Sequence, residues 1–99
     1  MILEIADFRI TPGQQAAFEA AVARGVDEAI RHAKGFNGYK LNRCIETPER
    51  FVLMIYWDTL EDHTVGFRES PAFTAWRAIV GPFFAAPPVV EHFELASKS

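Results

Sequence analysis

The sequence lacks the residues on which disulfide-bonded, zinc-binding and membrane-spanning proteins depend. It has one cysteine, Cys44, which excludes an internal disulfide and a zinc site built from cysteines. No apolar run approaches the roughly 18 residues of a membrane span, and no basic segment followed by an apolar one stands at the N-terminus. We therefore expect a cytoplasmic protein without a signal peptide or a membrane partner.

Clustered positive charge and grouped metal ligands are missing as well. The ten lysines and arginines are scattered and the formal net charge is −3, so no nucleic-acid partner is expected. The three histidines, His32, His63 and His92, do not have the spacing of metal ligands. We therefore expect no metal site.

Hydrophobic residues, in contrast, are abundant. They make up 49% of the 99 residues and include nine phenylalanines, which is high for a chain with so small an interior. A domain of this size buries about two thirds of its unfolded surface and is only marginally stable alone. We therefore expect one domain over residues 1–99, stabilised by association with a second copy.

The most hydrophobic stretch is the seven-residue run Phe-Val-Leu-Met-Ile-Tyr-Trp at positions 51–57. It reads as a strand, in which Leu53, Ile55 and Trp57 face one way and the residues between them face the other. Both faces need cover, but a chain this short can place helices on only one. The other face must therefore meet a ligand or a second copy of the protein.

Strands and helices alternate along the rest of the chain. Residues 2–10 predict a first strand, and an apolar stripe of helical period predicts a helix from Pro12 to residue 34, capped by Thr11 and ended by Gly35. Residues 36–46, including Ile45, predict an edge strand that a short hairpin joins to residues 51–57. Residues 89–95 predict the last strand.

Two helical pieces are predicted between residues 58 and 80. Asp58 and Glu61 have the spacing of a capping box that opens the first piece. Ser70 and Pro71 have the character of an N-cap and a first helical residue, and predict the start of the second piece. The inner faces are expected to hold Leu60, His63, Thr64 and Phe67 in the first piece, and Phe73, Trp76, Arg77 and Val80 in the second.

This order of elements predicts an α+β, ferredoxin-like βαββαβ fold with a four-stranded antiparallel sheet. Both helical regions would cover one face of that sheet. The bare face would pack against the same face of a second copy, so that the pair encloses a cavity.

Two segments resemble the antibiotic biosynthesis monooxygenase domain family. They are Trp-Asp-Thr-Leu-Glu-Asp-His at 57–63 and Phe-Arg-Glu-Ser-Pro-Ala-Phe at 67–73, and the likeness continues through Phe-Phe at 83–84 and Pro-Val-Val-Glu-His-Phe at 88–93. The resemblance covers nearly the whole chain and implies a dimeric α/β barrel of ferredoxin-like subunits. The family includes cofactor-free oxygenases of aromatic polyketides and quinols, and heme-degrading oxygenases.

The polyketide-oxygenase branch of the family implies three catalytic positions. Its cavity has a tryptophan at the strand exit, a tyrosine six residues later and an arginine twenty residues later, which correspond here to Trp57, His63 and Arg77. Leu53 stands where that branch has an asparagine. The tryptophan, histidine and asparagine of the heme-degrading branch have no counterparts, so heme cleavage is not expected.

These positions suit the chemistry of a cofactor-free oxygenase. His63 has a pKa near neutral and would act as the base, while the guanidinium of Arg77 would hold a phenolate. The substrate would be bound by Leu53 and the aromatic side chains of Phe67, Phe73 and Trp76. We thus expect a cofactor-independent monooxygenase of a small phenolic, quinol or polyketide-like compound, with no cofactor. Its homodimer would form through the open sheet face and the C-terminal strand.

Each residue also has a plainer interpretation. Trp57 and Phe73 would serve only to pack the core, His63 would be an exposed or capping residue, and Arg77 would pair with a carboxylate. His92 would be a contact at the dimer interface. For the whole protein, the alternative is a non-catalytic dimer that binds a small hydrophobic metabolite or has a regulatory role.

Overall fold

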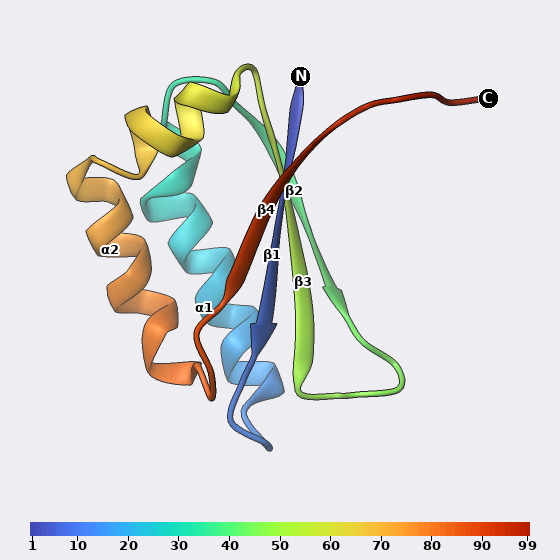
Figure 1. The fold of residues 1–99 in the computed structure, drawn as a ribbon. Helices are drawn as coiled ribbons and strands as arrows, with labels where there is room; N and C mark the ends of the chain where they lie inside the picture. Colours follow the sequence, from blue (N-terminus) through green and yellow to red (C-terminus); the bar gives the residue numbers. More distant parts are fainter.

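Four strands and two main helices follow one another in the predicted order. The protein is described here by a computed structural model that covers residues 1–99. Figure 1 shows both helices on one side of the sheet. The elements are β1 (Ile2–Arg9), α1 (Gln15–Glu28), the 3₁₀ turn η1 (Ile30–His32), β2 (Phe36–Arg43), β3 (Arg50–Trp57), the π-helix η2 (Asp62–Phe67), α2 (Pro71–Val80), the 3₁₀ turn η3 (Gly81–Phe83) and β4 (Val89–Glu94).

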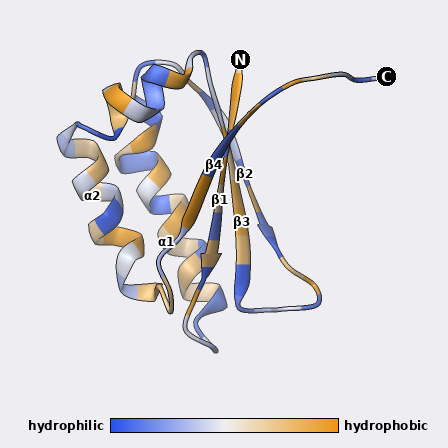
Figure 2. Ribbon diagram, viewed as in Figure 1, coloured by the Kyte–Doolittle hydropathy of each residue, from blue (hydrophilic) through white to orange (hydrophobic).

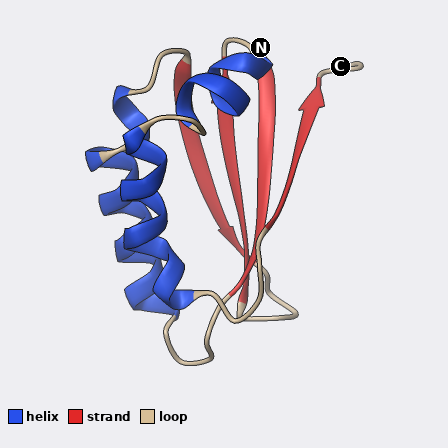
Figure 3. Ribbon diagram, turned by 60° about the vertical axis from the view of Figure 1, so that its left-hand side comes forward, coloured by secondary structure: helices blue, strands red, loops and turns tan.

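The strands form one antiparallel sheet in the order β2-β3-β1-β4. Figure 3 shows the four strands with the helical layer stacked on one face only. The predicted ferredoxin-like fold is confirmed, as is the placing of β2 at an edge beside β3. The most hydrophobic strand, β3, lies inside the sheet and is coloured as hydrophobic along most of its length in Figure 2.

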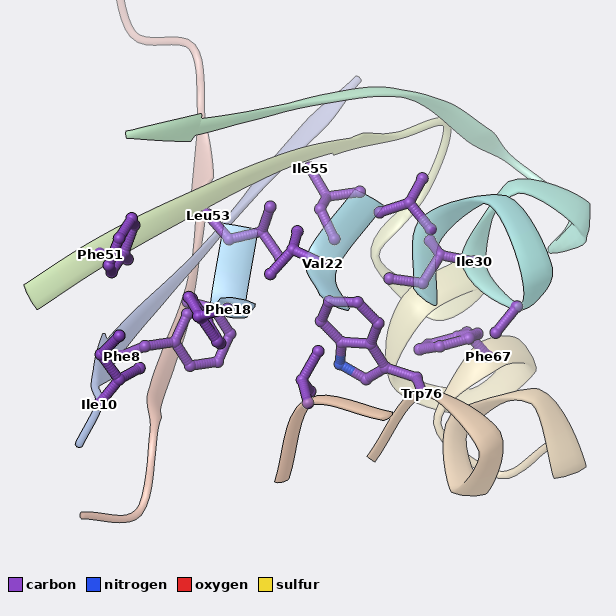
Figure 4. Packing of buried hydrophobic residues seen from close by; sticks show 14 of the residues in the cluster. Phe8, Ile10, Phe18, Val22, Ile30, Phe51, Leu53, Ile55, Phe67 and Trp76 are labelled. Carbon is purple, nitrogen blue, oxygen red and sulfur yellow. The ribbon is translucent and has the colours of Figure 1, made fainter. Parts of the chain in front are cut away.

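The predicted alternation along β3 is also confirmed. Phe51, Leu53, Ile55 and Trp57 are buried beneath the helices, and the residues between them are half-buried on the open face. Helix α1 meets the buried side through a stripe that includes Phe18, Val22 and Val26. The aromatic rings of Phe8, Phe18 and Phe51 pack together at one end of this core, with Phe67 and Trp76 at the other (Figure 4). The core therefore lies entirely between one sheet face and the helices.

The start of α1 differs from the prediction. The helix begins at Gln15, and Thr11 does not cap it. Gly13 adopts the left-handed conformation (φ 85°) and separates Pro12 from the helix. The backbone N–H of Thr11 donates instead to the carbonyl oxygen of Phe83 at 2.9 Å, so this segment ties β1 to the turn after α2.

The end of the first helical region is shorter than predicted. Helix α1 stops at Glu28, and a 3₁₀ turn carries the chain onward. Gly35 is left-handed as predicted (φ 85°), but it leads into β2 rather than ending the α-helix. Strand β2 ends at Arg43, and Ile45, predicted to lie in that strand, is 91% exposed in the hairpin loop.

The predicted capping box at Asp58 and Glu61 is wrong. The hydroxyl of Thr59 accepts a hydrogen bond from the backbone N–H of Asp62 at 3.1 Å, while the side chain of Asp58 bonds to Asn37. The start of α2 at Pro71 is confirmed. Ser70 precedes it, although its hydroxyl donates to the carbonyl oxygen of Phe67 instead of capping the helix. Neither main helix has the length and apolarity that crossing a bilayer requires.

We predict that Gly25→Ala lowers the free energy of unfolding by about 1–3 kcal/mol, the usual cost of overpacking a core. Helices α1 and α2 approach so closely here that a Cβ on Gly25 would lie 2.6 Å from Cε3 of Trp76. Urea denaturation at one protein concentration measures the effect. Gly81→Ala is the matched control, since a Cβ there meets nothing within 4 Å, and equal stability of the two variants would contradict this packing.

Candidate functional site

A cavity of about 320 Å³ lies between the helix-covered sheet face and the second helical region. Strands β1, β3 and β4 contribute one wall, and η2 and α2 contribute the other. Most of its lining is hydrophobic, but two acid–base side chains, Glu4 and His63, and two guanidinium groups, Arg68 and Arg77, also reach it. The cavity therefore combines an apolar interior with a few charged or titratable groups.

Six of the seven site residues predicted from the sequence line this cavity. Figure 4 shows Phe67 and Trp76 across the core from Leu53 and Ile55. Trp57 does not line the cavity, because it is completely buried in the core. That these residues bind or act on a substrate stays a prediction. The six that line the cavity are Leu53, His63, Phe67, Phe73, Trp76 and Arg77.

His63 is turned inward by the π-helix η2. The backbone N–H of Arg68 donates to the carbonyl oxygen of His63, five residues back, at 2.9 Å, and this wide turn places both His63 and Phe67 on the buried side. The imidazole stacks on the indole of Trp57, with ring centroids 5.2 Å apart. His63 is 3% exposed, so its interpretation as an exposed or capping residue is wrong.

Glu4, His63 and His92 form a polar triad beside the cavity, which Glu4 and His63 line. His63 Nε2 lies 3.3 Å from Glu4 Oε1, and His63 Nδ1 lies 2.7 Å from His92 Nε2. The indole N–H of Trp57 donates to the same Glu4 oxygen at 2.9 Å. Glu4 and His92 are register partners on the adjacent strands β1 and β4. Sheet pairing and η2 thus bring together three residues that lie far apart in the sequence.

Burial sets the protonation of this triad. It raises the pKa of Glu4 to about 7, despite the opposing effects of the Trp57 hydrogen bond and the Arg68 charge. It lowers the pKa of His63 to about 4, helped by Arg68 and His92. The pKa of His92 is lowered by burial and then by Arg68. The carboxyl of Glu4 therefore holds a proton more readily than the imidazole of His63 does, and the two groups lie in polar contact at 3.3 Å.

The two arginines lie at the mouth of the cavity, since both line it and both are solvent-exposed. The guanidinium carbon of Arg77 lies 5.6 Å from the ring centre of Phe84 and 5.9 Å from that of Phe73. Neither arginine forms an ion pair with a carboxylate. The pairing interpretation of Arg77 is therefore wrong, and both cations are free to meet an anion in the cavity.

The triad is not arranged as a metal centre. The two ring nitrogens of His63 face different partners, Glu4 and His92, so the three side chains do not converge on one point. No group of three histidine, cysteine, aspartate or glutamate residues elsewhere has metal-binding geometry.

Sequence reasoning missed Glu4 and Arg68 as site residues, and took His92 for an interface contact. A signal for Glu4 was available, because it shares a strand face with the buried residues Ala6 and Phe8. An acidic residue at an inward-facing strand position needs buried polar partners. Those partners come from β3, β4 and η2, which only the tertiary structure brings together.

Comparison with known proteins gives a consistent result. The family model described as "Antibiotic biosynthesis monooxygenase" matches residues 1–79. YczJ, an uncharacterized protein of Bacillus subtilis (strain 168), is 37% identical over 94 residues, which cover 95% of this chain and 98% of that protein.

Solved structures share the fold. A protein of the same family from Bordetella bronchiseptica superposes with a TM-score of 0.91 and 42% identity, covering 97% of each chain. A monooxygenase of Streptomyces coelicolor from the gene ActVA-Orf6, solved with the ligand nanaomycin D, has a TM-score of 0.84 at 19% identity. That match covers 99% of this chain and 89% of the other, and it supports the fold alone.

We predict that Glu4→Gln changes how stability depends on pH. Between pH 4.5 and 7, folded Glu4 keeps a proton that the unfolded chain has released, so its contribution to the free energy of unfolding falls as pH rises. A shift of this size corresponds to a loss on the order of 3 kcal/mol. Glu4→Gln has no titrating carboxyl at this position, so its free energy of unfolding does not decline for this reason. The lowered pKa of His63 acts in the opposite direction, but it is common to both proteins.

Urea denaturation at pH 4.5 and pH 7, at one protein concentration, measures this difference. The stability of the wild type relative to Glu4→Gln should decline between the two pH values, whereas its stability relative to the control Glu28→Gln, at an exposed position of α1, should show no such change. A constant difference between wild type and Glu4→Gln would show that Glu4 titrates normally.

Proposed function

We propose, since this chain belongs to the antibiotic biosynthesis monooxygenase family, that it is a cofactor-independent monooxygenase of a small phenolic, quinol or polyketide-like compound. The observation that carries this proposal is the make-up of the cavity. Aromatic rings line it, a buried carboxyl and imidazole stand at one wall, and two arginines without carboxylate partners stand at its mouth. Those are the groups that an ionisable aromatic substrate requires.

The reaction begins with ionisation of the substrate. A phenol or an acidic C–H gives its proton to the buried triad, and the electron pair stays on the ring system as an anion held by the guanidinium of Arg77. This electron-rich anion is the reductant and dioxygen the oxidant. A carbon–oxygen bond forms to give a peroxide, which takes up the stored proton. The O–O bond and the C–H bond at that carbon then break, so that water leaves and the carbonyl of the product forms.

The apolar walls support this chemistry in two ways. Phe67, Phe73 and Trp76 offer flat surfaces against which a planar substrate can stack. They also keep water from the anion, so that its charge is met by fixed protein groups. Trp57, which lies outside the cavity, acts as a positioning residue, since its indole N–H holds Glu4 and its ring supports His63.

One protein of the same fold was solved with an aromatic ligand. The Streptomyces coelicolor monooxygenase was solved with nanaomycin D, an aromatic polyketide. We infer the same general class of ligand for this chain from its own cavity, whose volume and rings suit a compound of that kind.

We also propose that the protein is a homodimer joined through its open sheet face and C-terminal strand. Exposed hydrophobic side chains gather there, including Val89, Phe93 and Leu95. A hollow of about 360 Å³ on this side is lined by Leu3, Tyr56 and Phe93, among others. Burying such a surface against a second copy removes apolar area from water.

The purified, metal-free protein is predicted to consume oxygen with members of a panel of hydroquinones and anthrones. Arg77→Ala should lower kcat by about 10²-fold, the usual cost of removing one charge-stabilising group, and Arg77→Lys should be intermediate. Arg24→Ala, an exposed arginine on α1, is the control. A rate equal to that of buffer alone across the panel would refute the proposed function, and full activity of Arg77→Ala would refute the role of this arginine.

Phe93→Asp is predicted to shift the protein from dimer to monomer, because it places a charge within the proposed interface. Phe93 is 47% exposed in one subunit. Val65→Asp is a matched control, since Val65 is 50% exposed but lies on η2, away from the open sheet face. Sedimentation equilibrium measures the mass. A monomeric wild type, or an undisturbed dimer of Phe93→Asp, would contradict this interface.

A further inference from the structure

We infer that Glu4, His63 and His92 form one proton-transfer unit, in which Glu4 takes the proton of the bound substrate and His92 connects that carboxyl with solvent. The catalytic part of this inference rests on the proposed function. The connection between the three groups does not, because it follows from their contacts alone.

Glu4 has one oxygen for its protein partners and one for the cavity. Trp57 Nε1 and His63 Nε2 both contact Oε1, and no protein group bonds to Oε2. Every fully buried side-chain nitrogen and oxygen has a hydrogen-bond partner, so Oε2 is not fully buried, and we place its opening at the cavity that Glu4 lines. A substrate proton therefore meets Oε2 first. Glu4 is 6% exposed, and the imidazole of His63 offers its proton a second route besides this opening.

His63 can relay a proton because each ring nitrogen has one partner. When the Glu4 carboxylate accepts from Nε2–H of His63, the Nδ1 lone pair is free to accept from Nε2–H of His92. In the outward direction Glu4 gives its proton to Nε2 of His63, His63 passes its Nδ1 proton to Nε2 of His92, and the resulting His92 imidazolium releases the proton of its other ring nitrogen to solvent. The stacked ring of Trp57 holds the imidazole in the required orientation.

His92 is the outer end of the line. It lies on the edge strand β4 and is half-buried, in contrast to the enclosed Glu4 and His63. Its side chain is on the helix-covered side of the sheet, whereas the exposed Phe93 belongs to the open face. Proton exchange through His92 and dimer formation through Phe93 therefore use different sides of the same strand.

The charges around Glu4 come from every element that packs against it. Strand β4 contributes His92, η2 contributes His63, and Arg68 directly follows η2, while β3 contributes the uncharged indole donor of Trp57. Arg77 of α2 lines the same cavity. The positive charge of Arg68 acts on all three members of the triad, favouring the ionised carboxyl and opposing protonation of both imidazoles. Burial outweighs this charge at Glu4, so the carboxyl rather than either imidazole holds the transferred proton, and the raised pKa of Glu4 suits it to accept and return a proton near neutral pH.

The proton balance of the unit is closed. The substrate O–H or C–H bond breaks, its proton goes to Oε2 of Glu4, and the electron pair remains on the substrate as an anion. The same proton later returns to the peroxide that the anion forms with dioxygen. His63 and His92 let Glu4 lose any proton it holds before the substrate binds, so that the carboxylate is ready to accept.

The first test uses 4-nitrophenol, whose ionised form alone absorbs in the visible, and needs no turnover. Binding to the wild type below neutral pH should ionise the phenol and raise the phenolate absorbance. Glu4→Gln should bind the same compound without ionising it, and Glu28→Gln, a change at an exposed position of α1, should behave as the wild type. Equal ionisation in Glu4→Gln would overturn the assignment of Glu4. A failure of the wild type to bind the phenol would count against the proposed function instead.

The second test follows the imidazole nitrogens by ¹⁵N NMR. The resonances of His63 and His92 should respond together to a titration near neutral pH, and this shared response should vanish in Glu4→Gln. His92→Gln keeps a donor for His63 but cannot pass a proton on, so it should lower kcat in the oxygen assay and leave KM unchanged. Independent titration of the two histidines, or unchanged kcat in His92→Gln, would overturn the relay.

Discussion

The burial of one carboxyl group is the constraint on which the rest of this site depends. Glu4 lies on the covered face of β1, between the sheet and the helices, where an ionised carboxylate without partners would be very costly. The indole of Trp57 and the imidazole of His63 both meet its Oε1, and His92 meets His63. The buried polar groups therefore contact one another in turn, from Glu4 through His63 to His92. The carboxyl of Glu4 also lines the hydrophobic cavity, and it can hold or release a proton near neutral pH.

Strand pairing and helix geometry position each of these groups. Antiparallel pairing places His92 beside Glu4, and the period of the strand turns Trp57 toward the helices. The π-helix η2 places His63 on the buried side, stacked on the indole of Trp57. The close packing of α1 on α2 at Gly25 holds Trp76 at the cavity wall. The arginines remain at the mouth, where solvent meets their charge while the cavity stays apolar.

Much of this arrangement was predictable from the sequence, for physical reasons that differ between residues. The period of the apolar residues predicted the sheet, the helices and the inward side of β3, because burial patterns are local properties of a strand or helix. The family likeness pointed to His63 and Arg77, which the structure places in one cavity. The predicted caps at Thr11 and Asp58 are wrong, because the backbone N–H of Thr11 and the side chain of Asp58 bond to residues far away in the sequence. Local sequence patterns do not contain such partners. The role of Glu4 was missed for a similar reason, since its partners come from three other elements.

The protonation of Glu4 tests the central claim most directly. Selective ¹³C labelling of glutamate would let the carboxyl resonance of Glu4 be followed by NMR as the pH is varied, with the exposed Glu28 of α1 as an internal reference in the same sample. The account predicts a midpoint of about 7 for Glu4. A midpoint near the ordinary value of 4.5 would show that the carboxyl is ionised throughout the physiological range, and would contradict the account of this site.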